Sequence, residues 1–221
     1  MVARVRFIWG MKAPEHTRFD RLQADMKACR ACLQAGYFVQ PPAVAKGKRS
    51  ARIMTIGQAP GVTEVQAGRP FNAGSGKRLF LWLGQAGIDE AWFRRTQYMT
   101  AVTKCYPGKN KAGGGDRVPT RVEQELCSHF LKLELELVQP RLIIPIGRLA
   151  ILRFFSAKKA LEDLIGTELE IDGRWVVPLP HPSGASRWHQ IAANRKRIEQ
   201  AIERIAIHYK RLFPNRRSNG Y

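Results

Sequence analysis

The sequence predicts an α/β fold, a three-layer α/β/α sandwich with a central four-stranded, mainly parallel sheet. Short apolar runs typical of buried strands alternate with segments whose apolar residues recur at helical spacing. This alternation is typical of a parallel sheet covered on both faces. Two of the runs also stop abruptly at glycine- and proline-rich turns, as strands do at the carboxyl edge of an open sheet. The 221 residues suffice for one such domain, expected to span 1–221.

The first quarter of the chain is expected to supply a helix, a loop and the first strand. Residues 1–16 are irregular and basic and are expected to form a flexible end. Apolar residues at helical spacing predict a helix over 18–35. The segment 36–51, with its prolines and lysines, is predicted to be a loop, either an edge that contacts phosphates or a plain linker. The apolar run 52–56 predicts the first strand.

The next elements are a helix, a strand and a flexible loop. Helical spacing predicts a helix over 76–86, with the Ser75 hydroxyl available to cap its start. The run 98–102 predicts a second strand. Residues 106–119 combine glycines, prolines and basic residues, which favours a flexible basic loop.

A long helix over 120–138 has a clear start signal, because Thr120 is followed three residues later by Glu123, the pattern of a capping box. A third strand is expected over 142–146, and a helix over 148–155. The fourth strand is predicted over 175–179, where it stops at a proline-rich turn. A last amphipathic helix covers 187–212, and residues 213–221 are expected to be a second flexible end.

The charge balance favours a polyanionic partner. The chain has 37 Lys and Arg against 18 Asp and Glu, a net charge of +19 spread along its length. Nucleic acid is the simplest partner, and a solvated basic surface is the alternative. No stretch is typical of a basic amphipathic helix on a membrane, a membrane span or a signal peptide. We therefore expect a cytoplasmic monomer, bacterial, working with the nucleoid DNA.

Four cysteines form a candidate metal-binding set, because thiols inside cells stay reduced. Cys29 and Cys32 are spaced as a CxxC pair, while Cys105 and Cys127 are single and 21 residues separate them. One close pair with two distant singles can enclose a zinc ion or a four-iron cluster. Four buried structural thiols are the alternative.

Two loops are expected to meet at one edge of the sheet. The first strand ends at Gln58 and the fourth at His181, and the carboxyl ends of parallel strands lie on the same side. Ser183 and Gly184 follow, with backbone amides that could meet a phosphate. Phe71, in the polar loop after the first strand, is either a core plug or a platform on which a flat ring stacks.

Taken together, residues 25–200 resemble the uracil-DNA glycosylase superfamily, and within it the iron–sulfur branch of families four and five. The residues that carry the resemblance form several motifs. They are Gly57-Gln58-Ala59-Pro60-Gly61, Glu64 with Gly68-Arg69-Pro70-Phe71, the strand 98–102 leading to Cys105, Cys127, Ile143-Ile144-Pro145-Ile146-Gly147-Arg148, and His181-Pro182-Ser183.

The resemblance implies a 4Fe-4S cluster on the four cysteines and a uracil flipped out of DNA. The base would stack on Phe71, His181 would donate a hydrogen bond to the departing uracil oxygen, and the first loop would hold the attacking water. No diffusible cofactor is then needed. Gln58 and His181 are thus the candidate catalytic residues, and Ala59, Phe71 and Asn72 the candidate base-binding residues. Candidate DNA contacts are Lys104, Ser183, Gly184 and Arg187.

Three departures from the family pattern shape the alternatives. Gln58 stands where family four has glutamate, and Ala101 where it has the asparagine that reads uracil, a residue that family five lacks too. The segment 62–72 also lacks the basic insert and covalently bonding histidine of another branch, so covalent trapping is not expected. The main hypothesis is a monofunctional uracil-DNA glycosylase. The alternatives are a protein that holds abasic or damaged DNA with weak catalysis, and a glycosylase for another deaminated base.

Overall fold

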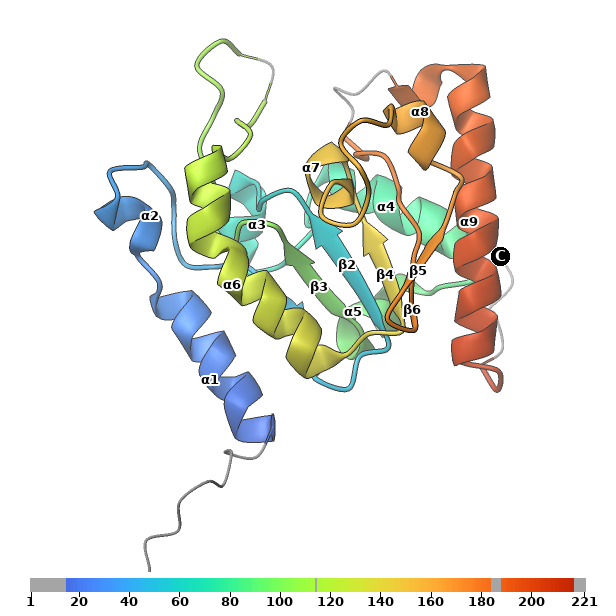
Figure 1. Ribbon diagram of the computed structural model, residues 1–221, viewed down its shortest axis with the longest axis horizontal. Coiled ribbons are helices and arrows are strands. Elements are labelled where there is room, and N and C mark those ends of the chain that lie inside the picture. Colours follow the sequence, from blue (N-terminus) through green and yellow to red (C-terminus); the bar gives the residue numbers. More distant parts are fainter. Residues whose placement is uncertain (1–14, 114, 184–187, 217–221) are drawn as a thin grey trace, which may run out of the picture.

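The computed structural model describes residues 15–113, 115–183 and 188–216. It confirms the α/β sandwich, in which helices pack on both sides of one sheet (Figure 1). The strands are β1 Lys46–Gly47, β2 Ile53–Gly57, β3 Tyr98–Ala101, β4 Leu142–Pro145, β5 Leu169–Ile171 and β6 Arg174–Val176. The helices are α1 Glu15–Ala28, α2 Ala31–Gln34, α3 Val62–Ala67, α4 Gly74–Gln85, α5 Glu90–Thr96, α6 Arg121–Val138, α7 Arg148–Ile151, α8 Leu161–Leu164, the 3₁₀ turn η1 Trp188–Gln190 and α9 Ala192–Leu212.

The sheet has six strands in the order β1-β3-β2-β4-β6-β5, so the prediction of four strands was wrong. The four central strands are the predicted ones and run parallel. The two additional strands, β1 and β5, run antiparallel at the edges. β1 consists of only two residues, and both lie inside the segment 36–51 that was predicted to be a loop. β5 forms a hairpin with β6 around Asp172 and Gly173, both at positive φ, and this Asp-Gly pair is a hairpin signal in the sequence.

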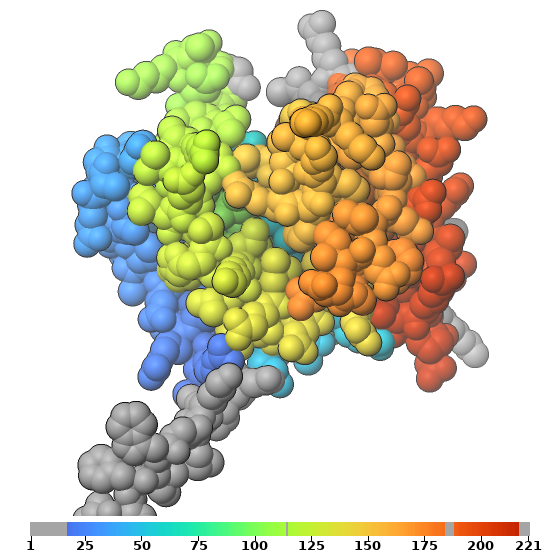
Figure 2. Space-filling model, viewed as in Figure 1, coloured from blue at the N-terminus to red at the C-terminus, as the bar shows by residue number. Residues whose placement is uncertain are grey.

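The two faces of the sheet have separate hydrophobic cores, because successive strand residues point to opposite faces. On one face Ile53 and Ile144 pack with α4, α5 and α9. On the other face Met54 and Ile143 pack with α1 and α6, which lie side by side in Figure 1. In the same orientation the space-filling view shows α6 and the chain after β4 covering the strands (Figure 2). The sheet is therefore buried on both sides, and its edges and strand ends are where chemistry can occur.

The start of α6 confirms its sequence signal. Thr120 Oγ1 accepts a hydrogen bond from the Glu123 amide at 3.3 Å, and Glu123 Oε2 accepts one from the Thr120 amide at 2.7 Å. The single helix predicted over 18–35 is instead broken between α1 and α2. Arg30 at the break has φ −132° and ψ 14°, and its guanidinium donates to the carbonyl of Cys29 at 2.8 Å. This contact satisfies a carbonyl that the end of α1 leaves without a helical partner.

The ends expected to be flexible, residues 1–16 and 213–221, lie only partly within the described residues. Residues 15 and 16 belong to α1, and residues 1–14 and 217–221 lie outside the described residues. Phe213 packs edge-on against Trp92 with ring centroids 5.0 Å apart, and the Arg216 guanidinium lies 4.1 Å from the centre of the Trp92 ring. The described chain beyond α9 is thus anchored on α5. Within the described residues, no helix combines the length and the apolar character that crossing a membrane requires.

Candidate active site

A pocket of ≈ 420 Å³ lies at the carboxyl edge of the parallel strands. It is lined by Val44, Gly57, Gln58, Ala59, Pro60, Glu64, Pro70, Phe71, Ser75, Thr100, Ala101, Ile146 and His181. The ends of β2 and β3 and the segments that follow β4 and β6 therefore contribute to one wall. The chain connections diverge from β2 to either side of the sheet, which is where ligands bind in open α/β folds. The predicted Gln58, Ala59, Phe71 and His181 meet in this pocket.

Phe71 forms a fixed wall of the pocket and is also part of the core, with its side chain 8% exposed. A Cβ on Gly57 would stand 3.1 Å from Phe71 Cζ, so the ring occupies space that the missing side chain leaves. The Phe71 backbone has φ +52°, which is uncommon for a residue with a side chain. Glu64 Oε1 accepts its N–H at 2.5 Å and Arg94 donates to its carbonyl at 2.7 Å, and these contacts hold the conformation.

Glu64 is the acidic side chain in the pocket wall, and its carboxylate is engaged in structure. It caps α3 by accepting the amide of Gly61, in addition to that of Phe71. Burial raises the pKa of Glu64, while the backbone hydrogen bonds from Gly61 and Phe71 oppose the shift. This carboxylate therefore ties both ends of the 61–71 loop together.

His181 also lines this pocket, with its ring packed against Gly147. A Cβ on Gly147 would lie 3.2 Å from His181 Cδ2, so a larger residue there would displace the imidazole. The Ser183 amide donates to His181 Nδ1 at 3.3 Å, which leaves the proton of a neutral ring on Nε2. The side chain is exposed at the pocket mouth, yet the protein around it desolvates the imidazolium and lowers the pKa of His181. The charge of Asp116 partly opposes this shift.

We expect the His181 ring to titrate below the ordinary histidine pKa of about 6.5, because burial disfavours the charged form. The ring is then neutral at pH 7 and gains its proton only as the pH falls below that range. Histidine ring signals followed by NMR across pH 4–9, with the His181 signal assigned by its loss in His181→Ala, measure this directly. A titration midpoint above the ordinary histidine value of about 6.5 would contradict the expectation.

Asn72 is not brought into the pocket. Its Oδ1 accepts a hydrogen bond from Arg69 Nε at 2.8 Å, and its Nδ2 donates to the Thr63 carbonyl at 3.3 Å. Both ends of the amide are thus used within the 61–72 loop, and Asn72 does not line the cavity. The geometry does not support the prediction that Asn72 reads the base.

The structure corrects two of the four candidate DNA contacts. Lys104 is 1% exposed, and its ammonium donates to Glu134 Oε2 at 2.7 Å, so the prediction of a DNA contact was wrong. The Ser183 amide is engaged by His181, which corrects the expectation that it is free for a phosphate. Gly184 and Arg187 lie outside the described residues.

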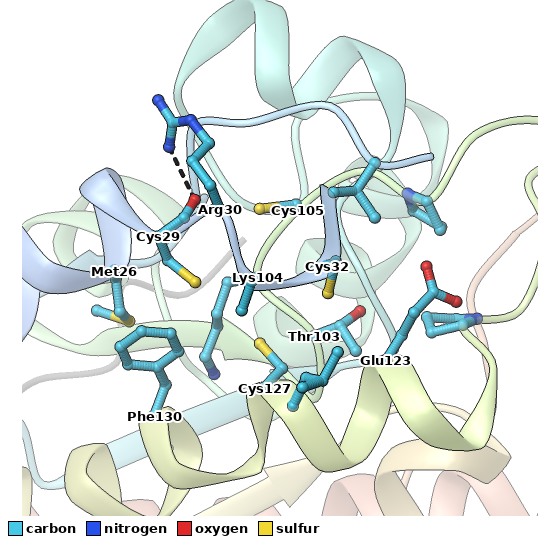
Figure 3. A pocket seen from close by; sticks show the side chains of 15 residues that line it. Met26, Cys29, Arg30, Cys32, Thr103, Lys104, Cys105, Glu123, Cys127 and Phe130 are labelled. Carbon is cyan, nitrogen blue, oxygen red and sulfur yellow. Dashed lines mark hydrogen bonds between the residues drawn. The ribbon is translucent and has the colours of Figure 1, made fainter. Parts of the chain in front are cut away.

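The four cysteines line a second cavity, of ≈ 480 Å³, although they come from four segments (Figure 3). Cys29 follows α1, Cys32 lies in α2, Cys105 follows β3 and Cys127 lies in α6. The break between α1 and α2 brings the first two to the same cavity. Figure 3 shows the four sulfur atoms arranged around it together with Thr103, whose buried hydroxyl lacks a hydrogen-bond partner among the described residues.

The four thiols around this cavity are a donor set of the kind that holds a metal group. No three histidine, cysteine or acidic side chains of the described chain converge closely enough for one ion, whose Zn–S bonds would be about 2.3 Å. Burial raises the pKa of Cys32 to about 11 and that of Cys105 to about 12, and the neighbouring cysteines add to both shifts. Four sulfur atoms so placed are stable as thiolates only beside positive charge. Four sulfur atoms around one cavity, with the orphaned Thr103 hydroxyl beside them, are consistent with a metal group held by thiolates.

Comparison with known families decides where this site belongs. The family model described as the uracil DNA glycosylase superfamily matches residues 44–206, which include every residue that lines the pocket. The chain belongs to the uracil-DNA glycosylase superfamily. Within the matched segment lie Cys105 and Cys127, whereas Cys29 and Cys32 precede it.

Relatives within the superfamily are identical to this chain at about one aligned residue in three. A Type-4 uracil-DNA glycosylase from Thermotoga maritima is 34% identical over 142 residues, or 63% of this chain and 69% of the relative. A Type-4 uracil-DNA glycosylase from Archaeoglobus fulgidus is 31% identical over 174 residues, covering 74% of this chain and 81% of the relative. A Type-5 uracil-DNA glycosylase from Pyrobaculum aerophilum is 34% identical over 115 residues, 47% of this chain and 48% of the relative. The similarity thus extends to two named types of the superfamily.

Several residues that line the pocket were not predicted from the sequence to do so. Ser75 was expected to cap α4, but Ala73 is the N-cap and the half-buried Ser75 lines the pocket from the first turn. Val44 reaches the pocket from the segment predicted as a loop or linker. Ala101, which the sequence indicated only as a replacement of the family's asparagine, also lines the pocket, and Lys104 Nζ donates to its carbonyl at 2.5 Å. The sequence signal that could have indicated them is their position close to predicted strands or to the start of a predicted helix.

Proposed function

We propose that this chain is a monofunctional DNA glycosylase that flips uracil out of DNA and excises it, leaving an abasic site. Uracil-DNA glycosylase activity is the family-level function of the superfamily to which the chain belongs, and the relatives described above carry it in their names. The observation that carries the proposal for this chain is the meeting of Gln58, Phe71 and His181 in one pocket. The +19 charge supports DNA as the partner.

The pocket provides the interactions that breaking an N-glycosidic bond requires. A flipped uracil stacks on the Phe71 ring, and the departing base develops negative charge on its oxygen as the sugar becomes cation-like. A neutral His181 with its proton on Nε2 donates a hydrogen bond to that oxygen. This donor is already oriented by the Ser183 amide and the Gly147 backbone, so it stabilises the charge without reorganising. Gln58 positions the attacking water.

We further propose that Cys29, Cys32, Cys105 and Cys127 hold a 4Fe-4S cluster. Such a cluster supplies structural cross-links, because four thiolates leave no open ligand position for substrate. The four cysteines would join α1, α2, the segment after β3 and α6, which stabilises the edge of the site that β3 provides. The sequence-based expectations of a monomer in the bacterial cytoplasm, with the nucleoid DNA, are retained as part of the proposal.

Protein purified without oxygen is expected to absorb visible light and to contain iron and acid-labile sulfide in equal amounts. Cys127→Ser is expected to remove most of the iron and lower the melting temperature, because Cys127 lies in the buried part of the cavity. Elemental analysis and thermal unfolding measure both effects. Stoichiometric zinc in place of iron would contradict this assignment.

An excision assay tests the proposed function. Single-stranded and duplex oligonucleotides carrying one uracil are incubated with the protein, and alkali then cleaves the abasic sites. We expect alkali-dependent strand breaks at the uracil and free uracil in solution. Breaks without alkali would contradict a monofunctional enzyme, and the absence of breaks in every context would contradict uracil excision.

Two features favour a second candidate, a protein that holds abasic or damaged DNA with weak catalysis. Gln58 cannot take a proton from water, and Ala101 presents no side-chain amide to the base. Tight binding to abasic DNA with negligible product from uracil DNA would favour this candidate. Product from hypoxanthine or xanthine DNA in the same assay would instead favour a glycosylase for another deaminated base.

A further inference from the structure

Asp116 is an acidic residue beside the pocket that neither the motifs nor the proposed mechanism uses. It lies in the 106–119 segment between β3 and α6, where an isolated antiparallel bridge pairs it with Lys109. The Tyr106 hydroxyl donates to Asp116 Oδ1 at 3.0 Å, and the Arg117 amide donates to the Gly108 carbonyl at 2.9 Å. These contacts fix the position of a carboxylate whose side chain remains exposed.

The second carboxylate oxygen of Asp116 faces the first motif. A Cβ on Gly61 would stand 3.3 Å from Asp116 Oδ2 and 3.2 Å from Glu64 Oε2, so both carboxyl groups lie against the turn that follows Gln58. The Glu64 carboxylate already accepts hydrogen bonds from the backbone amides of Gly61 and Phe71. Asp116 itself lies outside the residues that line the base pocket, against the Gly61 turn that follows Gln58.

The charge of Asp116 acts on two residues of the pocket. It adds to the rise that burial causes in the pKa of Glu64, and it opposes the fall that burial causes in the pKa of His181. A negative charge beside a pocket that is proposed to receive DNA weakens binding to phosphates. In a chain with 37 basic and 18 acidic residues, a fixed acid at this position works against affinity.

We propose that Asp116 is the catalytic carboxylate of this site, and that it supplies at the sugar the negative charge that Gln58 lacks. The inference rests on the proposed function, because it concerns the same reaction. Its carboxylate stabilises the cation-like sugar and accepts a proton from the attacking water.

The step balances without a further reactant. The C1′–N1 bond breaks, and its electron pair leaves with the uracil ring. The water oxygen bonds to C1′, and the proton that the water loses passes to the Asp116 carboxylate and then to solvent. The uracil anion takes up a proton from solvent, so the products are uracil and an abasic sugar.

Asp116→Asn tests the proposal, because it removes the charge and keeps the shape and one acceptor oxygen. Single-turnover excision of uracil from a single-stranded oligonucleotide is expected to slow about 100-fold. The affinity for the same oligonucleotide without uracil is expected to stay equal or increase. Asp25→Asn, an exposed position on α1, removes the same charge away from the pocket and is expected to keep the wild-type rate.

Tyr106→Phe separates catalysis from support of the segment, because it removes the hydrogen bond to Asp116 and keeps the carboxylate. We expect a smaller loss of rate than in Asp116→Asn at an unchanged melting temperature. Gln58→Glu, which returns a carboxylate to the pocket, is expected to recover part of the rate in the Asp116→Asn background.

The outcomes that overturn the proposal are distinct from those that overturn the proposed function. Wild-type excision with an undiminished rate in Asp116→Asn overturns the role of Asp116 alone. A loss in Tyr106→Phe as large as in Asp116→Asn, or no recovery with Gln58→Glu, also overturns it, because each points to a structural role. Wild-type protein that releases no uracil overturns the proposed function itself.

Discussion

His181→Ala is expected to lower the single-turnover rate of uracil excision roughly 100- to 1,000-fold, the usual effect of losing one preorganised donor to a developing anion. Nε2–H is the donor, because the Ser183 amide occupies Nδ1. The affinity for uracil-free DNA is expected to change little, since the interaction forms fully only as the bond breaks. Quenched single-turnover assays with excess enzyme give the rate, and titration with labelled DNA gives the affinity.

Two matched variants make the test of His181 sharper. Gln58→Ala is expected to lose less than His181→Ala, because an amide positions water but takes no proton from it. His129→Ala removes a histidine that is exposed on α6 and is expected to keep the wild-type rate. Equal activity in His181→Ala and wild type would remove His181 from the mechanism.

Lys104→Met is expected to destabilise the protein by about 3–5 kcal/mol, because it leaves the carboxylate of Glu134 buried without its cation. Lys104 and Glu134 are 1% and 0% exposed, and their charged atoms are 2.7 Å apart. Thr100 donates to Glu134 at 2.9 Å, and the Tyr98 hydroxyl does so at 3.1 Å. Removing one member therefore disrupts a network that links β3 to α6. Chemical unfolding with wild-type and variant protein measures the change.

A double variant separates the charge from the packing. Lys104→Met combined with Glu134→Leu replaces the pair with apolar side chains and is expected to recover much of the lost stability, since apolar replacement of a buried pair is often neutral. Unfolding free energies of the single variant within about 1 kcal/mol of wild type would contradict the expectation. Iron content measured in parallel shows whether the cluster proposed at the adjacent Cys105 is retained.

The sequence predicted the elements whose signals are local. The Thr120 and Glu123 capping box lies within one turn of helix, and the apolar runs that became β2, β3 and β4 need no distant contact to be recognised. The arrival of Gln58 and His181 at one edge also followed, because parallel strands share their carboxyl ends. These features depend on neighbours in sequence or on the topology of the sheet.

The features that escaped prediction depend on partners far along the chain. Lys104 follows a strand and resembles a DNA-binding lysine until Glu134, 30 residues away, is seen beside it. Asp116 lies in a segment of glycines and basic residues, and its position next to Gly61 follows only from the folded hairpin. The edge strand β1 has two residues, too few to produce an alternating pattern.

The fixed backbone of Phe71 has a consequence for how DNA contexts are discriminated. Glu64 and Arg94 hold this residue before any nucleotide arrives. The backbone at Gly57 packs closely against the Phe71 ring, and that at Gly76 against the Phe71 carbonyl, so closely that a Cβ at Gly76 would collide with it. The stacking surface that we propose is therefore rigid, and little conformational entropy remains to be lost on the protein side when a base enters. The energetic barrier to recognition then lies in the DNA, in the unstacking and unpairing of the nucleotide itself. A uracil that is weakly paired or stacked in its duplex has less of this barrier to overcome, so such a uracil would enter the proposed pocket preferentially.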